Sequence, residues 1–96
     1  MIRANHLRWI AQAWPFPGKR MRLLGEYASL GHLPLVLADI TLRGGVGRSP
    51  HVPGDPYTTA LNNGRRDLAE EILALAGCDP RSIEDLIERK PPGEDR

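Results

Sequence analysis

The sequence predicts an all-α fold: a small bundle of three to four short helices with a long loop rich in glycine and proline. Apolar residues recur at spacings of three and four in several segments, which is the period of one helix face. Prolines and glycines separate these segments. Only residues 33–43, rich in Val, Leu and Ile, leave a buried strand open as an alternative, so helices dominate the prediction.

The N-terminal residues 1–18 form either an arm or a short helix. Leu7, Ile10 and Trp14 make a narrow apolar stripe at helical spacing. The two prolines between Trp14 and Gly18 end it, because proline cannot continue the backbone hydrogen bonding of a helix. The aromatic residues here either cover a small core or anchor a partner or a membrane.

Two helices follow, predicted over residues 19–30 and 33–43. Gly31 and His32 interrupt the apolar pattern between them, and Pro34 is tolerated in a first helical turn. The pair Gly44-Gly45 ends the second of these helices, since glycine readily takes the conformation that closes a helix.

The clearest element begins at Asp55, a residue suited to accept hydrogen bonds from the free N–H groups of a first turn, followed by proline. An apolar stripe then advances in steps of three and four until Gly77 closes the helix. Gly64 lies on this stripe, and we expect it to admit a neighbouring backbone. The stripe consists of Tyr57, Leu61, Gly64, Leu68, Ile72 and Leu75.

A second Asp-Pro start, at Asp79, opens a last short helix that ends near residue 90. Because only two residues join it to the preceding helix, we expect a hairpin or a corner. Residues 91–96 form a polar tail that we expect to be loose. The whole chain, residues 1–96, is interpreted as one small domain.

The loop sequence LRGGVGRSPHVPGDPY, residues 42–57, superficially resembles a phosphate-binding loop. That motif needs a glycine where Leu42 stands and a lysine where Arg48 stands, and Pro50 opposes a helix starting at the serine. The segment is either an ordinary surface loop or an arm over residues 46–52 that becomes ordered against a neighbouring subunit.

Nothing in the sequence assembles a catalytic, cofactor or metal site, so we expect neither an enzyme nor a cofactor. The three histidines are isolated, and Cys78 has no second cysteine with which to form a disulfide. No apolar run approaches eighteen residues, which argues against a membrane segment. We expect assembly in a reducing cytoplasm.

The net charge of +1 hides an asymmetry, since residues 1–48 hold seven Lys/Arg against two Asp/Glu, and residues 49–96 hold six against ten. Such a chain can attract copies of itself head to tail, or present its basic half to an acidic protein or nonspecifically to DNA. The alternative is that both halves are solvated surface. The basic side chains expected to contact a partner are Lys19, Arg20, Arg22, Arg48, His51, Arg65 and Arg66.

The segment GDPYTTALNNGRRDLAEEILALAG, residues 54–77, resembles a family of small tailed-bacteriophage proteins encoded near the portal and terminase genes. The resemblance covers roughly residues 44–88, while residues 1–20 depart from the pattern. It is carried by an Asp-Pro turn, an aromatic residue, a Gly-Arg-Arg step and an aliphatic helix: Asp55, Pro56, Tyr57, Gly64, Arg65, Arg66, Leu68, Ile72 and Leu73.

The resemblance implies a virion structural protein, made in the host cytoplasm and built into the particle at the portal or head-to-tail neck. Its partners would then be portal or neck components and copies of itself, with nonspecific DNA contact left open. The alternative is a DNA-packaging accessory resembling a small terminase subunit, and a third reading is a nonvirion regulatory protein.

Overall fold

The computed structural model describes residues 3–88, and within that range it contains helices and no strand. The all-α prediction is confirmed, and residues 33–43 are helical. Five α-helices exceed the three to four expected, because the N-terminal segment is itself a helix. The loose tail predicted for residues 91–96 lies outside the described residues. The elements are α1 (Ala4–Ala13), α2 (Pro17–Ser29), the 3₁₀ turn η1 (Leu30–His32), α3 (Pro34–Gly44), α4 (Pro56–Leu75) and α5 (Pro80–Glu88).

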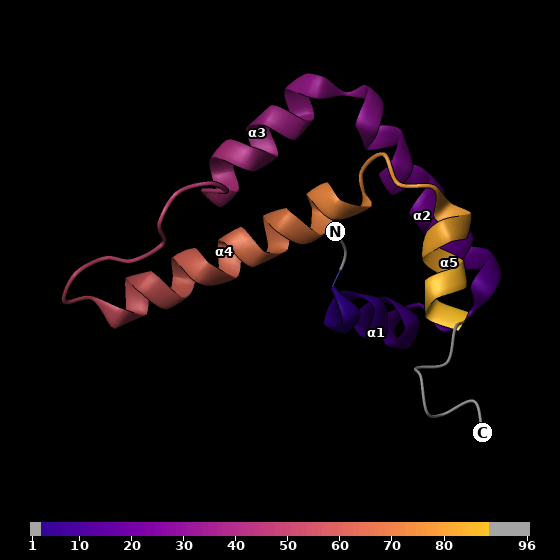
Figure 1. The fold of residues 1–96 in the computed structure, drawn as a ribbon, viewed down its shortest axis with the longest axis horizontal. Helices are drawn as coiled ribbons and strands as arrows, with labels where there is room; N and C mark the ends of the chain where they lie inside the picture. Colours follow the sequence, from indigo (N-terminus) through magenta and orange to yellow (C-terminus); the bar gives the residue numbers. More distant parts are fainter. Residues whose placement is uncertain (1–2, 89–96) are drawn as a thin grey trace.

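The helices form an open arrangement with two ends. Helices α3 and α4 run side by side in opposite directions as a hairpin, and their connecting loop lies at one extremity (Figure 1). Helices α1, α2 and α5 gather at the other end, where α5 packs against α2 and α1. The Cα radius of gyration is 15.5 Å, against about 12–13 Å for a compact chain of this length. The molecule is therefore elongated.

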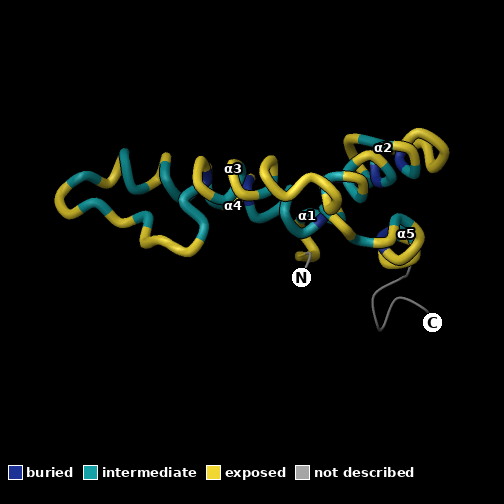
Figure 2. The backbone as a smooth tube through the Cα atoms, turned by 90° about the horizontal axis from the view of Figure 1, so that it is seen from above, coloured by how far each residue is buried: buried dark blue, intermediate teal, exposed yellow. Residues whose placement is uncertain are grey.

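The core is small and lies at the end where α1, α2 and α5 meet the last turn of α4. Each of these four helices contributes one fully buried aliphatic side chain: Ile10, Leu24, Leu75 and Ile83. Around them pack Leu7, Tyr27, Cys78 and Ile87. In Figure 2 most of the tube away from this end is half-buried or exposed, including the whole loop of the hairpin. Most of the hairpin's apolar surface therefore lies outside the core.

The predicted helix starts and stops are found close to their expected positions. Asp55 caps α4, because its Oδ1 accepts a hydrogen bond from the Thr58 N–H at 2.9 Å, and this bond lowers the pKa of the Asp55 carboxyl. Asp79 Oδ1 accepts from the Arg81 N–H in the same way at the start of α5. Gly45 closes α3 with φ of 66°. Local chemistry thus sets these boundaries.

The apolar stripe predicted on α4 is not the face that α4 buries. Tyr57 is 87 % exposed, Leu61 61 % and Leu68 58 %, and only the C-terminal end of the stripe, at Leu75, reaches the core. Helix α4 meets α3 instead through the small residue Ala69, which lies against Gly44. Two small residues let the helix backbones approach closely, and this contact turns the large apolar side chains outward.

The expectation that Gly64 admits a neighbouring backbone is wrong within this chain. A Cβ atom built at Gly64 meets nothing within 4 Å, whereas one built at Gly44 collides with the Cβ of Ala69. A second close approach joins Gly31 in the η1 turn to Gly77, whose Cα lies 2.9 Å from a Cβ built at Gly31. The glycines that permit close packing are therefore Gly44 and Gly31.

The loop between α3 and α4 is tied to the first turns of α4 by polar side chains. The Val52 N–H donates to Thr59 Oγ1 at 2.9 Å, and Asn62 Nδ2 donates to the Pro50 carbonyl at 3.2 Å. These bonds hold part of the loop against α4 within the chain itself.

Candidate partner-binding surfaces

One face of α4 forms an exposed apolar surface, here called the docking seam: Tyr57, Leu61 and Leu68. Steps of four and seven residues keep the three side chains on one side of the helix. Gly64 lies between Leu61 and Leu68 and leaves the backbone uncovered there. The seam is a contiguous apolar strip with a central notch.

The seam runs into a groove of about 630 Å³ between α1, α2 and α4, because Leu68 lines both. Aromatic and aliphatic side chains cover most of the groove wall, and Trp9 at its edge is 59 % exposed. Its apolar lining consists of Trp9, Ile10, Trp14, Leu23, Tyr27, Leu68, Ile72 and Leu75. Seam and groove together offer a partner one continuous apolar surface.

Two polar contacts between α4 and the N-terminal segment border this groove. Arg3 Nη2 lies 4.0 Å from Glu70 Oε2, and His6 Nε2 lies 3.9 Å from Glu71 Oε1. The Arg3–Glu70 pair is exposed and contributes little to stability. The two contacts nevertheless favour the placement of α1 beside α4 that forms the groove.

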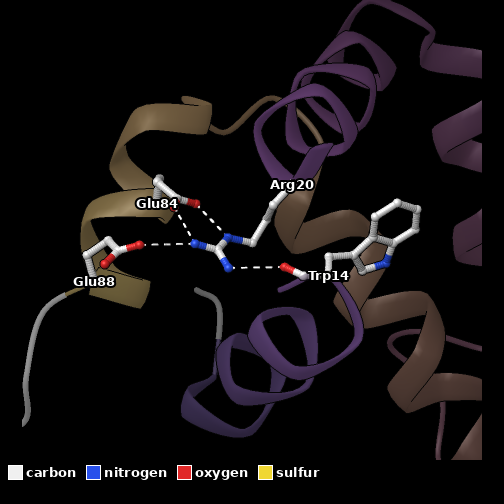
Figure 3. Close-up of polar contacts among 4 residues, drawn as sticks. All are labelled: Trp14, Arg20, Glu84 and Glu88. Atoms are coloured by element: carbon white, nitrogen blue, oxygen red, sulfur yellow. Dashed lines mark hydrogen bonds and ion pairs between the residues drawn. The ribbon is translucent and has the colours of Figure 1, made fainter. Parts of the chain in front are cut away.

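Arg20, expected to contact a partner, is instead an internal tie between α2 and α5. Its side chain is 4 % exposed and bonds Glu84 through both Nε and Nη2 (Figure 3). Nη2 also donates to Glu88 Oε1 at 3.1 Å, and Nη1 donates to the Trp14 carbonyl at 3.1 Å. The guanidinium therefore holds the α1–α2 turn against α5 and is unavailable to another molecule.

This contact shifts the pKa of both partners. The hydrogen bond with Glu84 raises the pKa of Arg20 above its usual value, and the same bond lowers the pKa of the Glu84 carboxyl, in each case against the effect of burial. Both shifts favour the charged forms, so the pair is ionised at neutral pH.

The remaining expected partner residues fall into three separate places. Lys19 and Arg22 are exposed on α2. Arg48 of the loop and Arg65 and Arg66 of α4 line one pocket beside the end of α3. His51 is exposed and borders a different hollow, next to Asp55. The structure thus does not bring the seven basic residues into one surface.

The group beside the loop, here called the arginine pocket, includes one residue that the sequence analysis missed. Arg43, from the last turn of α3, lines the same 230 Å³ pocket as Arg48, Arg65 and Arg66. The sequence could have indicated Arg43 by its position just before the Gly44-Gly45 pair that ends the helix. A residue there lies where the loop begins. Four arginines from three segments therefore line one pocket.

Part of the predicted charge asymmetry is neutralised inside the chain. Basic residues of the first half pair with acidic residues of the second, as in the Arg20–Glu84 and Arg3–Glu70 contacts. Charge alone thus gives less reason for head-to-tail self-association than the sequence suggested.

Within residues 3–88, no three His, Cys, Asp or Glu side chains converge as metal ligands do. In the same range, no helix has the length and hydropathy needed to cross a bilayer.

Comparison with known proteins identifies the chain over its C-terminal part. The sequence model of the family described as Bbp19-like phage protein matches residues 34–88, from the start of α3 to the end of α5. No curated protein and no solved structure matches the chain. Because the family match covers more than half of its residues, the chain belongs to the family of Bbp19-like phage proteins.

Proposed function

We propose that this phage protein is a small structural subunit of the virion, at the portal or head-to-tail neck, that acts through protein–protein contacts. The observation that carries the proposal is the docking seam, whose Tyr57, Leu61 and Leu68 side chains are all more than half exposed. Contiguous exposed apolar patches on small proteins mark interaction sites.

The small core supports this role. The core cluster has four fully buried aliphatic side chains, and large apolar side chains elsewhere face solvent. Burying apolar surface yields about 25 cal/mol per Å², so covering the seam and the groove with another protein would stabilise both the complex and this chain. The exposed Tyr57 and Trp9 are of the residue types that dominate binding energy at interfaces.

The partners proposed for this surface are other neck or portal proteins and copies of the same chain. A copy in a ring would place its seam against a different face of its neighbour, which is a heterologous contact. The notch at Gly64 would let a partner's backbone approach α4 more closely than any larger residue allows.

Mass spectrometry of gradient-purified phage particles tests the proposal. We expect the chain in a fixed, stoichiometric number of copies per particle, together with the portal protein. Its absence from intact particles, while it is present in infected-cell lysate, would contradict a structural role.

A second candidate, a DNA-packaging accessory, is favoured by the arginine pocket alone. Such a protein would bind DNA in lysate and be missing from finished particles. The particle measurement therefore separates the two candidates, since a virion subunit stays in the particle whether or not it also touches DNA.

A further inference from the structure

The arginine pocket combines a dense positive charge with a lining that contains no acidic residue. Its wall is formed by the end of α3, the loop and one face of α4, and besides the arginines it includes Ser49 and Asn62. The pocket is lined by the end of α3, the first part of the loop and the middle of α4. None of the buried core side chains Ile10, Leu24, Leu75 and Ile83 lines it. It is thus a distinct surface feature that the fold does not need for its core.

Two of the four arginines have carboxylate neighbours that engage them through Nε. Arg43 Nε donates to Asp39 Oδ2 at 2.7 Å, and Arg66 Nε lies 3.4 Å from Glu70 Oε1. These contacts orient each side chain, and both carboxylates lie outside the pocket lining.

The other two arginines, Arg48 and Arg65, have no carboxylate at ion-pair distance within residues 3–88. Both are exposed. The local balance is therefore four guanidinium groups against two carboxylates, and like charges held together repel each other unless an anion lies between them.

Two carbonyl groups in the last turn of α3 are already hydrogen-bonded within the chain. The Gly45 N–H donates to the Leu42 carbonyl at 3.2 Å, and the Val46 N–H donates to the Thr41 carbonyl at 3.1 Å. These bonds satisfy two of the four carbonyls that a helix leaves unpaired at its C-terminal end.

A phosphate group suits this pocket better than a protein carboxylate does. A carboxylate has two oxygens and typically pairs in bidentate fashion with one guanidinium group. A phosphate has more acceptor oxygens and can bind several guanidinium groups. No aromatic side chain lines the pocket, so nothing there would stack on a base. The chemistry is that of a sequence-independent contact with a nucleic-acid backbone.

We propose that Arg43, Arg48, Arg65 and Arg66 form a phosphate-binding site for the backbone of nucleic acid. The site is unlike a phosphate-binding loop, because side-chain guanidinium groups supply the contacts. It goes beyond the proposed docking function, and the seam is not required for it.

Fluorescence anisotropy with a labelled 20-base-pair DNA duplex of arbitrary sequence, repeated at several salt concentrations, tests the site. The variant pair Arg48→Gln and Arg65→Gln, made together, removes two exposed charges and should leave the melting temperature unchanged. We expect at least a tenfold loss of affinity at low salt. The slope of log affinity against log salt should fall by about 1–2, since each phosphate contact contributes about 0.9.

The matched control is Lys19→Gln with Arg22→Gln, which removes the same charge from the exposed surface of α2. This control should bind duplex within about twofold of the unmodified chain. Equal losses in both double variants would show that net charge alone is responsible and would overturn the site. No measurable duplex binding by the unmodified chain would overturn it as well.

Two competitors test whether the site prefers a nucleic-acid phosphate or an acidic protein. Inorganic phosphate should compete weakly with the duplex, and a polyglutamate peptide should compete less well than unlabelled duplex at equal charge. A peptide that binds more tightly than DNA, with the same dependence on Arg48 and Arg65, would replace the proposal by an acidic protein partner. Leu61→Ser removes the apolar side chain from the seam without adding a charge four residues before Arg65. It should retain duplex binding, so a failure of the docking function and a failure of this site give different results.

Discussion

At the scale of single residues, the contact between Arg20 and Glu84 shows how a charged pair can hold an open fold together. The Arg20 guanidinium reaches two carboxylates of α5 and the carbonyl of Trp14, and its side chain is nearly inaccessible to solvent. A sequence pattern of clustered basic residues cannot show this, because the partner lies more than sixty positions away. The neighbouring Lys19 and Arg22 look the same in sequence and remain exposed.

Glu84→Gln should lower the free energy of unfolding at pH 7 by about 1–3 kcal/mol, since it weakens charge-assisted hydrogen bonds. The folded chain lowers the pKa of Glu84. Its stabilising effect is therefore complete above the unfolded value of about 4.3 and is lost as the pH falls through the lower folded value. Urea unfolding between pH 3 and 7 measures the effect.

The matched control for Glu84 is Glu88→Gln, because the Glu88 side chain is 64 % exposed and its contact with Arg20 should contribute at most about 1 kcal/mol. We expect the difference in free energy of unfolding between the unmodified chain and Glu84→Gln to decrease below about pH 4. If this difference in free energy of unfolding stays constant down to about pH 3, the Glu84 charge does not stabilise the fold.

Two glycines of the hairpin should respond to alanine in opposite directions. Gly44→Ala places a methyl group against Ala69 and should lower the free energy of unfolding by about 1–3 kcal/mol. Gly64→Ala has open space around it and should raise that free energy by about 0.5–1 kcal/mol, as expected in a helix interior. Chemical denaturation of the two variants decides, and a loss at Gly64 equal to that at Gly44 would contradict the described packing.

At the scale of elements, the sequence predicts the helices better than it predicts their packing. Asp-Pro starts and glycine stops determine boundaries through local hydrogen bonds and backbone conformation, so α4 and α5 begin where expected. The buried face of α4 follows instead from the contact between Ala69 and Gly44, a tertiary interaction between residues that are inconspicuous in a hydrophobic pattern. The sequence predicts the apolar stripe of α4, but most of that stripe is exposed and lies outside the core.

For the candidate sites as well, the sequence predicts individual residues better than it predicts which of them come together. Arg48, Arg65 and Arg66 were identified as partner-binding candidates by their charge, and the structure places them in one pocket. Arg43 was missed because its proximity to them depends on how the hairpin folds back. His51 was predicted as a partner-binding side chain together with them, yet it borders another hollow.

At the scale of the whole molecule, the family match and the apolar groove involve different sets of helices. The match covers α3 to α5, which includes the seam and the arginine pocket, whereas the groove also needs α1 and α2. The N-terminal helices therefore extend a surface that the family segment already carries. The elongated shape follows, since the hairpin projects from a core that involves only the last turn of α4.

The central claim is that the docking seam serves assembly and not folding, and Leu61→Glu tests it most directly. Because Leu61 is 61 % exposed, the charge should change the free energy of unfolding by less than about 0.5 kcal/mol. The control is Leu35→Glu, at an 84 % exposed position on α3, nine residues and hence about half a turn around the helix from the Gly44 contact with α4.

The decisive measurement is the amount of each variant in particles assembled by a phage whose own copy of the chain is removed, alongside the variant's melting temperature. We predict that Leu61→Glu melts like the unmodified chain and is at least tenfold depleted from particles, while Leu35→Glu is incorporated normally. Normal incorporation of Leu61→Glu, or a loss that simply follows a lowered melting temperature, would contradict the claim.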